Sequence, residues 1–137
     1  MSTLLLLAED DPLMSGMYGR AFKLHDFDFK LAKNGEEALS MLRTMDPKPA
    51  VAVIDVMMPK KSGFDVLKEM KEDKTLSSIP VIILTNMSGD KDMKRGLELG
   101  ADLCLVKSQY SSKEVVLMIK ELIIKLENKV AGLNDKK

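Results

Sequence analysis

The sequence predicts a doubly wound α/β domain: a five-stranded parallel sheet between two layers of helices, in a three-layer αβα arrangement. Three observations lead to this prediction. Short apolar runs of strand length alternate with longer amphipathic segments along nearly all of the 137-residue chain. Most of these runs show no polar alternation, which is typical of parallel strands covered on both faces. Polar residues follow the runs directly, at the edge where an open parallel sheet binds its ligands.

The first two strand candidates enclose a clearly marked helix. Residues 4–8 (LLLLA) form the first apolar run. Asp11 and Pro12 come next, a good N-cap residue and a proline suited to the first helical position, so we expect a helix over residues 13–25. The weaker run at 27–32 alternates in polarity, which indicates an edge strand.

The middle of the chain repeats this order. Residues 34–45 place their apolar side chains on one side of a helix, which predicts an amphipathic helix packed against the sheet. The apolar run at 50–54 predicts a buried strand. Residues 63–73 again gather apolar side chains, Phe64 and Leu67 among them, on one helical face.

Two further strands and two helices complete the pattern. The runs at 81–85 and 103–106 predict strands, and a shorter helical segment at 90–99 separates them. The last helix, expected over 111–129, opens with SSKE, a capping box if Ser111 is the cap. Each strand is thus followed by a helix, which predicts right-handed crossovers between parallel strands.

Length and charge limit the possible classes of protein. The chain fits one domain, expected over residues 1–130, with a flexible tail at 131–137. Lys and Arg together number 21, as do Asp and Glu, so the formal net charge is zero. The sequence has no excess of basic residues that would indicate nucleic-acid binding by this domain or attachment to an anionic membrane.

Cysteine content and the N-terminal segment add two exclusions. Cys104 is the single cysteine, so an internal disulfide and a cysteine metal cluster are excluded. The first residues lack a basic segment, and their apolar run at 4–8 is too short for a signal peptide or a membrane span. A cytoplasmic location is the default expectation.

Residues that can carry chemistry stand at the ends of four apolar runs: Glu9, Asp10, Asp55, Thr85 and Lys107. Each alone has an ordinary interpretation, as a helix start, a solvated strand end, a common β residue or a surface lysine. Together they are more informative, because the carboxyl ends of parallel strands meet at one edge of the sheet. Carboxylates from two strands, a hydroxyl from a third and an amine from a fourth are therefore expected to converge.

This combination of groups suits phosphoryl transfer. Several carboxylates in one cleft repel one another, and a hard divalent cation such as Mg²⁺ relieves the repulsion. Lys107 and the Thr85 hydroxyl can hold phosphoryl oxygens, because the reaction needs mainly positioning and charge stabilisation. Asp55 is then the candidate nucleophile, forming an aspartyl phosphate.

The arrangement resembles the receiver domain of two-component response regulators. The similarity rests on the acid pair after the first run, DVMMPKKSG beginning at Asp55, Thr85 after the fourth strand and Lys107 after the fifth, supported by NGEEAL and GADLCLVK. It covers approximately residues 4–126. The resemblance implies a flavodoxin-like sheet in the order 2-1-3-4-5 and a phosphoacceptor rather than a turnover enzyme.

The resemblance also implies roles for individual residues. Asp55 is the expected phosphoacceptor and a ligand of Mg²⁺ or Mn²⁺. Asp10 is expected to bind the metal directly, Glu9 to act through water, and the backbone carbonyl of Met57 to complete the protein ligands; Thr85 and Lys107 would hold the phosphoryl oxygens. The implied partners are a sensor histidine kinase or a histidine phosphotransfer protein, and a downstream protein target whose affinity changes on phosphorylation.

Four positions depart from the family pattern. Cys104 stands where the family usually has an aromatic residue, so the usual threonine–aromatic switch is not expected. Ser108 replaces the usual proline after the lysine, and Asn86 is larger than the usual residue after the threonine. The side chain of Met57 is expected at the mouth of the site. These departures bear on rate and switching rather than on the family assignment.

Three alternative functions remain open at this stage. A phosphatase of the haloacid-dehalogenase type also forms an aspartyl phosphate, but its DxD motif is absent from AEDDPL after the first strand. A flavodoxin-like FMN carrier would need a first loop rich in Ser, Thr and Gly, and this loop is acidic. A receiver that is never phosphorylated is disfavoured, because all five site side chains are present.

Overall fold

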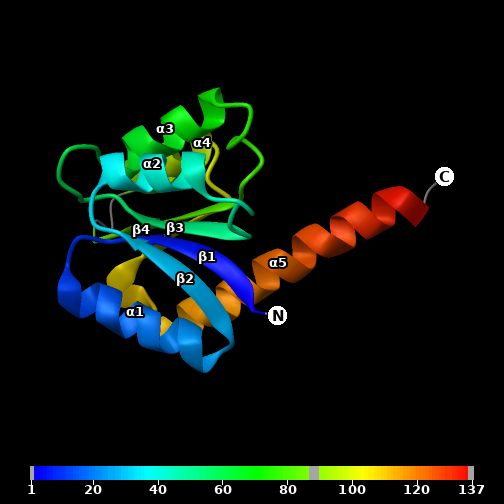
Figure 1. The fold of residues 1–137 in the computed structure, drawn as a ribbon, viewed down its shortest axis with the longest axis horizontal. Coiled ribbons are helices and arrows are strands. Elements are labelled where there is room, and N and C mark those ends of the chain that lie inside the picture. Colours follow the sequence, from blue (N-terminus) through cyan, green and yellow to red (C-terminus); the bar gives the residue numbers. More distant parts are fainter. Residues whose placement is uncertain (1, 87–89, 136–137) are drawn as a thin grey trace.

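Five parallel strands form a single sheet in the order β2-β1-β3-β4-β5, with helices on both faces (Figure 1). The computed structural model describes residues 2–86 and 90–135. Its elements are β1 (Thr3–Ala8), α1 (Pro12–Leu24), β2 (Phe27–Ala32), α2 (Gly35–Thr44), β3 (Val51–Asp55), α3 (Gly63–Glu72), β4 (Val81–Thr85), α4 (Asp90–Glu98), β5 (Leu103–Val106), the short 3₁₀ helix η1 (Lys107–Gln109) and α5 (Ser112–Asp135). The predicted fold class and sheet order are confirmed.

Two apolar cores lie on opposite faces of the sheet. One contains residues of α2 and α3, together with Cys104 from β5. The other contains residues of α1 and α5, including Tyr18 and Phe22. Side chains of the inner strands contribute to both cores in alternation, because successive strand residues point to opposite faces. This explains why β3 and β4 are buried along their whole length.

The expected caps are present. Asp11 accepts a hydrogen bond from the backbone N–H of Leu13 at 2.9 Å, with Pro12 as the first residue of α1. Ser111 and Glu114 form the predicted capping box: the Glu114 N–H donates to Ser111 Oγ at 3.1 Å, and the Ser111 N–H donates to Glu114 Oε1 at 3.0 Å. These contacts fix where α1 and α5 begin.

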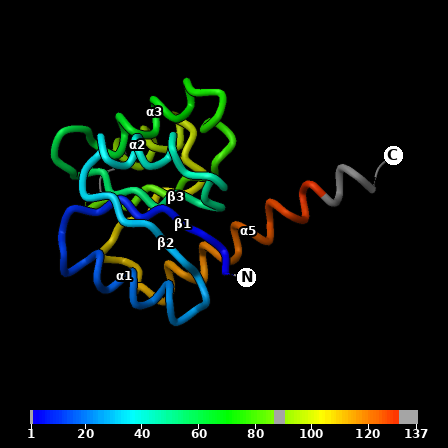
Figure 2. Tube along the Cα trace, in the orientation of Figure 1, coloured from blue at the N-terminus to red at the C-terminus, as the bar shows by residue number. Residues whose placement is uncertain are grey.

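Most element boundaries agree with the expected ones to within two residues, and α5 is the exception. It continues as a helix to Asp135, beyond the stretch expected to end at residue 129. Figure 2 traces the chain back to the sheet after each helix and then outward along α5, which projects beyond the other elements. The flexibility expected of residues 131–137 stays a prediction. Within the described part of the chain, no helix combines the length and the apolar character needed to cross a membrane.

Candidate functional site

The register of the strands brings the predicted site residues to one edge of the sheet. Ala8 pairs with Ile54, so Glu9 and Asp55 follow at the same level on neighbouring strands β1 and β3. Asp55 pairs with Leu84 on β4, and Thr85 in turn pairs with Val106 on β5. Lys107 is the next residue of the chain. The convergence expected from the sequence is therefore a direct result of parallel pairing.

A buried ion cluster forms the centre of the site. The Lys107 ammonium lies 2.6 Å from Glu9 Oε1 and 3.1 Å from Asp55 Oδ1. All three side chains are almost completely removed from solvent, with exposed fractions of 6% or less. Two carboxylates thus share one cation, and Lys107 is closer to Glu9 than to Asp55.

Asp55 is the less well compensated of the two carboxylates. Its Oδ1 lies at ion-pair distance from Lys107 but without hydrogen-bond geometry, so it accepts no hydrogen bond from the described residues. Burial, followed by the adjacent Glu9, raises the pKa of Asp55 from 3.8 to about 7, although Lys107 opposes the rise. A buried, poorly compensated carboxylate of this kind is typical of functional sites.

The charge of Lys107 is held in place by the same acids. Burial alone would lower the pKa of Lys107, but the hydrogen bond to Glu9 and the charges of Asp55 and Glu9 outweigh it and raise the pKa. Tyr18, a buried residue of α1, lies within electrostatic range of the cluster. Its burial raises the phenol pKa. Tyr18 was not predicted to lie near the site, because its helical spacing is that of a core residue.

The acidic residues are arranged as ligands for a hard cation. Carboxylate oxygens of Glu9, Asp10 and Asp55 all lie within 4.8 Å of one another. Glu9 and Asp55 are buried, whereas Asp10 is exposed. The Asp55 oxygen that accepts no hydrogen bond adds a second sign of fit, because a cation there would satisfy it. Oxygen ligands of this type match the preference of Mg²⁺ or Mn²⁺.

The loop after β3 is packed closely against Asp55. Val56 donates its N–H to Leu84 O at 2.9 Å, and Gly63 donates to Val56 O at 2.9 Å, which folds the loop back onto β3. A Cβ on Gly63 would lie only 2.4 Å from the carbonyl oxygen of Asp55, so this position requires glycine. The side chain of Met57 is 53% exposed. The metal-binding role of its backbone carbonyl stays a prediction.

Of the remaining predicted residues, Thr85, Asn86 and Ser108 lie at this edge, whereas Cys104 lies within β5. Thr85 is 2% exposed at the end of β4, and Asn86 after it is exposed. Cys104 is buried on the face that packs against α4, where a Cβ on Gly96 would come within 2.2 Å of its sulfur. Burial raises the pKa of this thiol, in keeping with its expected role as a small core residue. Ser108 lies in η1 and is exposed.

Comparison with known proteins gives consistent results. The model of the response regulator receiver domain family matches residues 5–120. The "Transcriptional regulatory protein CpxR homolog" of Haemophilus influenzae is 38% identical over 119 residues, covering 87% of this chain and 49% of that protein. The "Gliding motility regulatory protein" of Myxococcus xanthus is 32% identical, covering 85% of this chain and 15% of that protein. The chain therefore spans at most about half the length of these curated relatives.

Solved structures agree in fold. The receiver domain of the Francisella response regulator 1452 is 29% identical with a TM-score of 0.83, covering 91% of this chain and 99% of that one. The Mn²⁺-bound form of the response regulator Rcp1 is 28% identical with a TM-score of 0.74, covering 88% of this chain and 91% of that one. The family match and the curated relatives lead to one conclusion: the chain belongs to the response regulator receiver domain family, whose members are signalling phosphoacceptors that generally bind Mg²⁺ at an acidic pocket.

Proposed function

We propose that this chain is the phosphoacceptor of a His-Asp phosphorelay and that Asp55 is the residue phosphorylated. One observation supports this most strongly: the buried Asp55 carboxylate shares a single cation with Glu9, and its Oδ1 accepts no hydrogen bond from the described residues. An oxygen in that state is available both to a metal ion and to phosphorus.

The transfer follows from the charges in the site. The Asp55 carboxylate attacks the phosphorus of a phosphohistidine on a sensor kinase or a phosphotransfer protein. The new P–O bond forms as the P–N bond breaks, and the imidazole leaves with the bonding electron pair and takes up a proton. Lys107 is already held in the site as a cation, so it can compensate charge on a phosphoryl oxygen without a cost of reorganisation at that moment. The Thr85 hydroxyl is proposed to donate a hydrogen bond to a second phosphoryl oxygen.

A divalent cation is proposed to assist this reaction. Glu9, Asp10, Asp55 and the Met57 carbonyl would hold Mg²⁺ or Mn²⁺; the structure of a similar protein, Rcp1, is described as Mn²⁺-bound. When bound, the ion supplies positive charge that stabilises the transferring phosphoryl group. Among the described residues, Lys107 is the cation that Asp55 and Glu9 share.

Phosphorylation is proposed to shift an equilibrium between two conformations and so to change affinity for a downstream protein. Hydrolysis of the aspartyl phosphate by the same site would reset the switch, so the chain would catalyse only its own transfer and dephosphorylation. We further propose a cytoplasmic location. We also propose that this domain does not bind nucleic acid directly, since its formal net charge is zero.

The test is phosphorylation by a small acyl-phosphate donor. Incubation with acetyl phosphate and Mg²⁺ should increase the intact mass by one phosphoryl group in the wild-type chain and in Asp28→Asn, which removes an exposed carboxylate on β2. The increase should disappear in Asp55→Asn and on chelation of the metal. Equal incorporation in Asp55→Asn would overturn the assignment, as would no incorporation in the wild type.

A further inference from the structure

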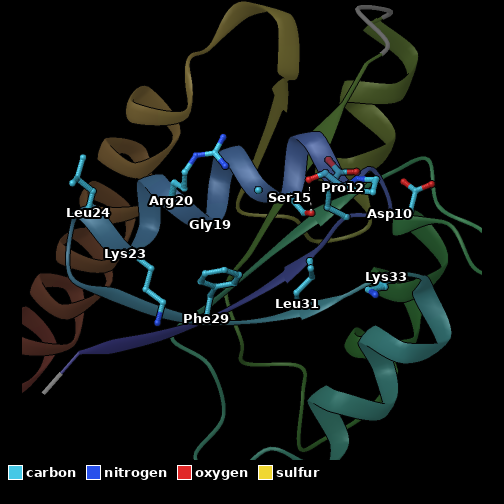
Figure 3. Close-up of a pocket in the computed structure, with 12 residues that line it drawn as sticks. Asp10, Pro12, Ser15, Gly19, Arg20, Lys23, Leu24, Phe29, Leu31 and Lys33 are labelled. Atoms are coloured by element: carbon cyan, nitrogen blue, oxygen red, sulfur yellow. Dashed lines mark hydrogen bonds between the residues drawn. The ribbon is translucent and has the colours of Figure 1, made fainter.

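A groove of about 950 Å³ runs between α1 and the edge strand β2. It approaches the ion cluster only at the end lined by Glu9 and Asp10. Figure 3 shows α1 lying across β2, with Phe29 and Leu31 pointing from the strand towards the helix. Asp10 marks one end of the groove and Leu24 the other. Apart from Glu9 and Asp10 at one end, the proposed phosphoryl-transfer chemistry uses none of the described residues that line the groove.

The groove exists because one face of the sheet carries fewer helices than the other. Adjacent strands are about 4.8 Å apart and packed helices about 10 Å apart, so a five-stranded sheet has room for roughly three helices on each face. α2 and α3 contribute to the core on one face, where α4 also packs against β5, whereas only α1 and α5 contribute to the other core. α1 itself rests on β2, so the groove lies along the flank of α1 beside this edge strand.

Two glycines of α1, Gly16 and Gly19, line the groove. A Cβ on Gly19 would lie 2.6 Å from Cζ of Phe29, so the helix rests directly on that ring. Gly16 also lines the groove, one turn nearer the acidic cluster, and a Cβ there would meet only the end of the Arg20 side chain, at 3.3 Å. A larger residue at position 16 would therefore enter the groove rather than disturb the core.

The lining identifies the chemistry of an occupant. Its floor is apolar, formed by the half-buried Phe29 and Leu31, and Leu24 at the far end is 82% exposed. Its margins carry the exposed cations Arg20, Lys23 and Lys33. An apolar strip between cations matches a helix with one apolar stripe and acidic residues beside it.

The acids near the groove do not cancel this basic character along its length. Glu9 is buried and paired with Lys107. Asp28 pairs with Lys23 at 3.1 Å, and both side chains are more than half exposed, so this ion pair contributes little and can exchange partners. The exposed Asp10 is confined to one end of the groove.

We propose that the groove between α1 and β2 is a docking site for an acidic amphipathic helix of a partner protein. The helix would lie along the flank of α1, beside the edge strand β2. α1 has 13 residues, so the occupant would run for about four turns, with apolar side chains at i, i+3 or i+4, and i+7 over Phe29 and Leu31. This proposal does not depend on phosphorylation of Asp55.

The test uses two designed helical peptides of about four turns. Both carry the same leucine stripe; one has glutamates beside it and the other has lysines. We expect the acidic peptide to bind the wild-type chain and the basic peptide to bind at least about tenfold more weakly, as measured by fluorescence anisotropy. Amide chemical-shift changes on the acidic peptide should centre on Phe29 and Leu31.

Two variants make the test specific. Gly16→Leu fills the groove and should weaken binding of the acidic peptide by about tenfold or more, while phosphorylation by acetyl phosphate is retained. Lys33→Glu combined with Arg20→Glu should reverse the preference between the two peptides. Leu97→Gln is the control. It changes an exposed apolar residue on α4, far from the groove, and should bind the acidic peptide like the wild type.

Several results would overturn the proposal. These are equal affinity for the two peptides, no binding of either, or acidic-peptide binding that Gly16→Leu leaves unchanged. A concentration-dependent dimer in analytical ultracentrifugation that Gly16→Leu abolishes would also overturn it, because a second copy of this chain would then be the occupant.

Discussion

Replacing Asp55 by asparagine should stabilise the metal-free protein, although it destroys the proposed phosphoacceptor. In the folded state the pKa of Asp55 is raised from 3.8 to about 7, with burial as the main cause. A carboxyl whose pKa is raised on folding binds its proton more tightly in the folded than in the unfolded state. The folded state is therefore penalised as pH rises from about 4 to about 7, and the penalty is constant above that.

The size of the effect follows from the shift. One pKa unit corresponds to about 1.4 kcal/mol, so the interval between pH 5 and a folded-state pKa near 7 amounts to roughly 3 kcal/mol. The free energy of unfolding of Asp55→Asn minus that of the wild type should thus increase by about 3 kcal/mol between pH 5 and pH 8. Taking this difference removes the contribution of the groups that titrate in both proteins.

The assay is urea denaturation followed by far-UV circular dichroism, with EDTA present at both pH values. Asp28→Asn is the matched control, because Asp28 is exposed on β2, and its difference from the wild type should be independent of pH in this range. A difference for Asp55→Asn that is the same at pH 5 and pH 8 would refute the reasoning. A loss of stability at pH 8 would refute it as well, since it would mean that Lys107 compensates Asp55 fully.

Three further predictions concern the same edge of the sheet. Mg²⁺ should raise the unfolding midpoint of the wild type, because a ligand that binds only the folded state stabilises it; Asp10→Asn should lose most of this increase while differing little from the wild type in EDTA. Lys107→Met should cost about 3–5 kcal/mol at pH 8, since it leaves two buried carboxylates without their cation, and less at pH 5 where Asp55 is protonated; a loss that did not depend on pH would contradict this, as judged by urea denaturation. Gly63→Ala should destabilise the fold by at least about 1–3 kcal/mol and slow phosphorylation, because its Cβ would lie 2.4 Å from the Asp55 carbonyl oxygen; wild-type stability and labelling rate would show that the loop has room to move.

The fold and the outline of the site were predictable from the sequence because both depend on simple patterns. Continuous apolar runs indicated strands buried on both faces, and the rule that parallel strands end at one edge brought Glu9, Asp55 and Lys107 together. Which acid Lys107 approaches more closely was not predictable. That preference, 2.6 Å to Glu9 against 3.1 Å to Asp55, depends on side-chain conformations in a packed site.

Other features depend on close approaches that no periodic pattern reveals. Gly96 and Cys104 lie on different elements, α4 and β5, and only the structure shows that a Cβ on one would meet the sulfur of the other at 2.2 Å. This explains why a small residue occupies position 104. The extension of α5 was also missed, because residues 131–137 were expected to form a flexible tail, and the helix includes Gly132. A single glycine inside a helix costs only about 1 kcal/mol, which a long helix tolerates.

The low compensation of Asp55 and its proposed role have the same physical origin. If Lys107 lay closest to Asp55, or if neighbouring N–H groups donated hydrogen bonds to Asp55 Oδ1, the carboxylate would be more stable. Its oxygen would then be less available to phosphorus. Instead the cation lies closer to Glu9, and burial keeps water from making up the difference. A proton or a divalent cation bound to Asp55 would each relieve the same repulsion with Glu9. The folded state is thus destabilised at one residue, and the pH dependence of Asp55→Asn measures how much of this destabilisation a bound cation can relieve.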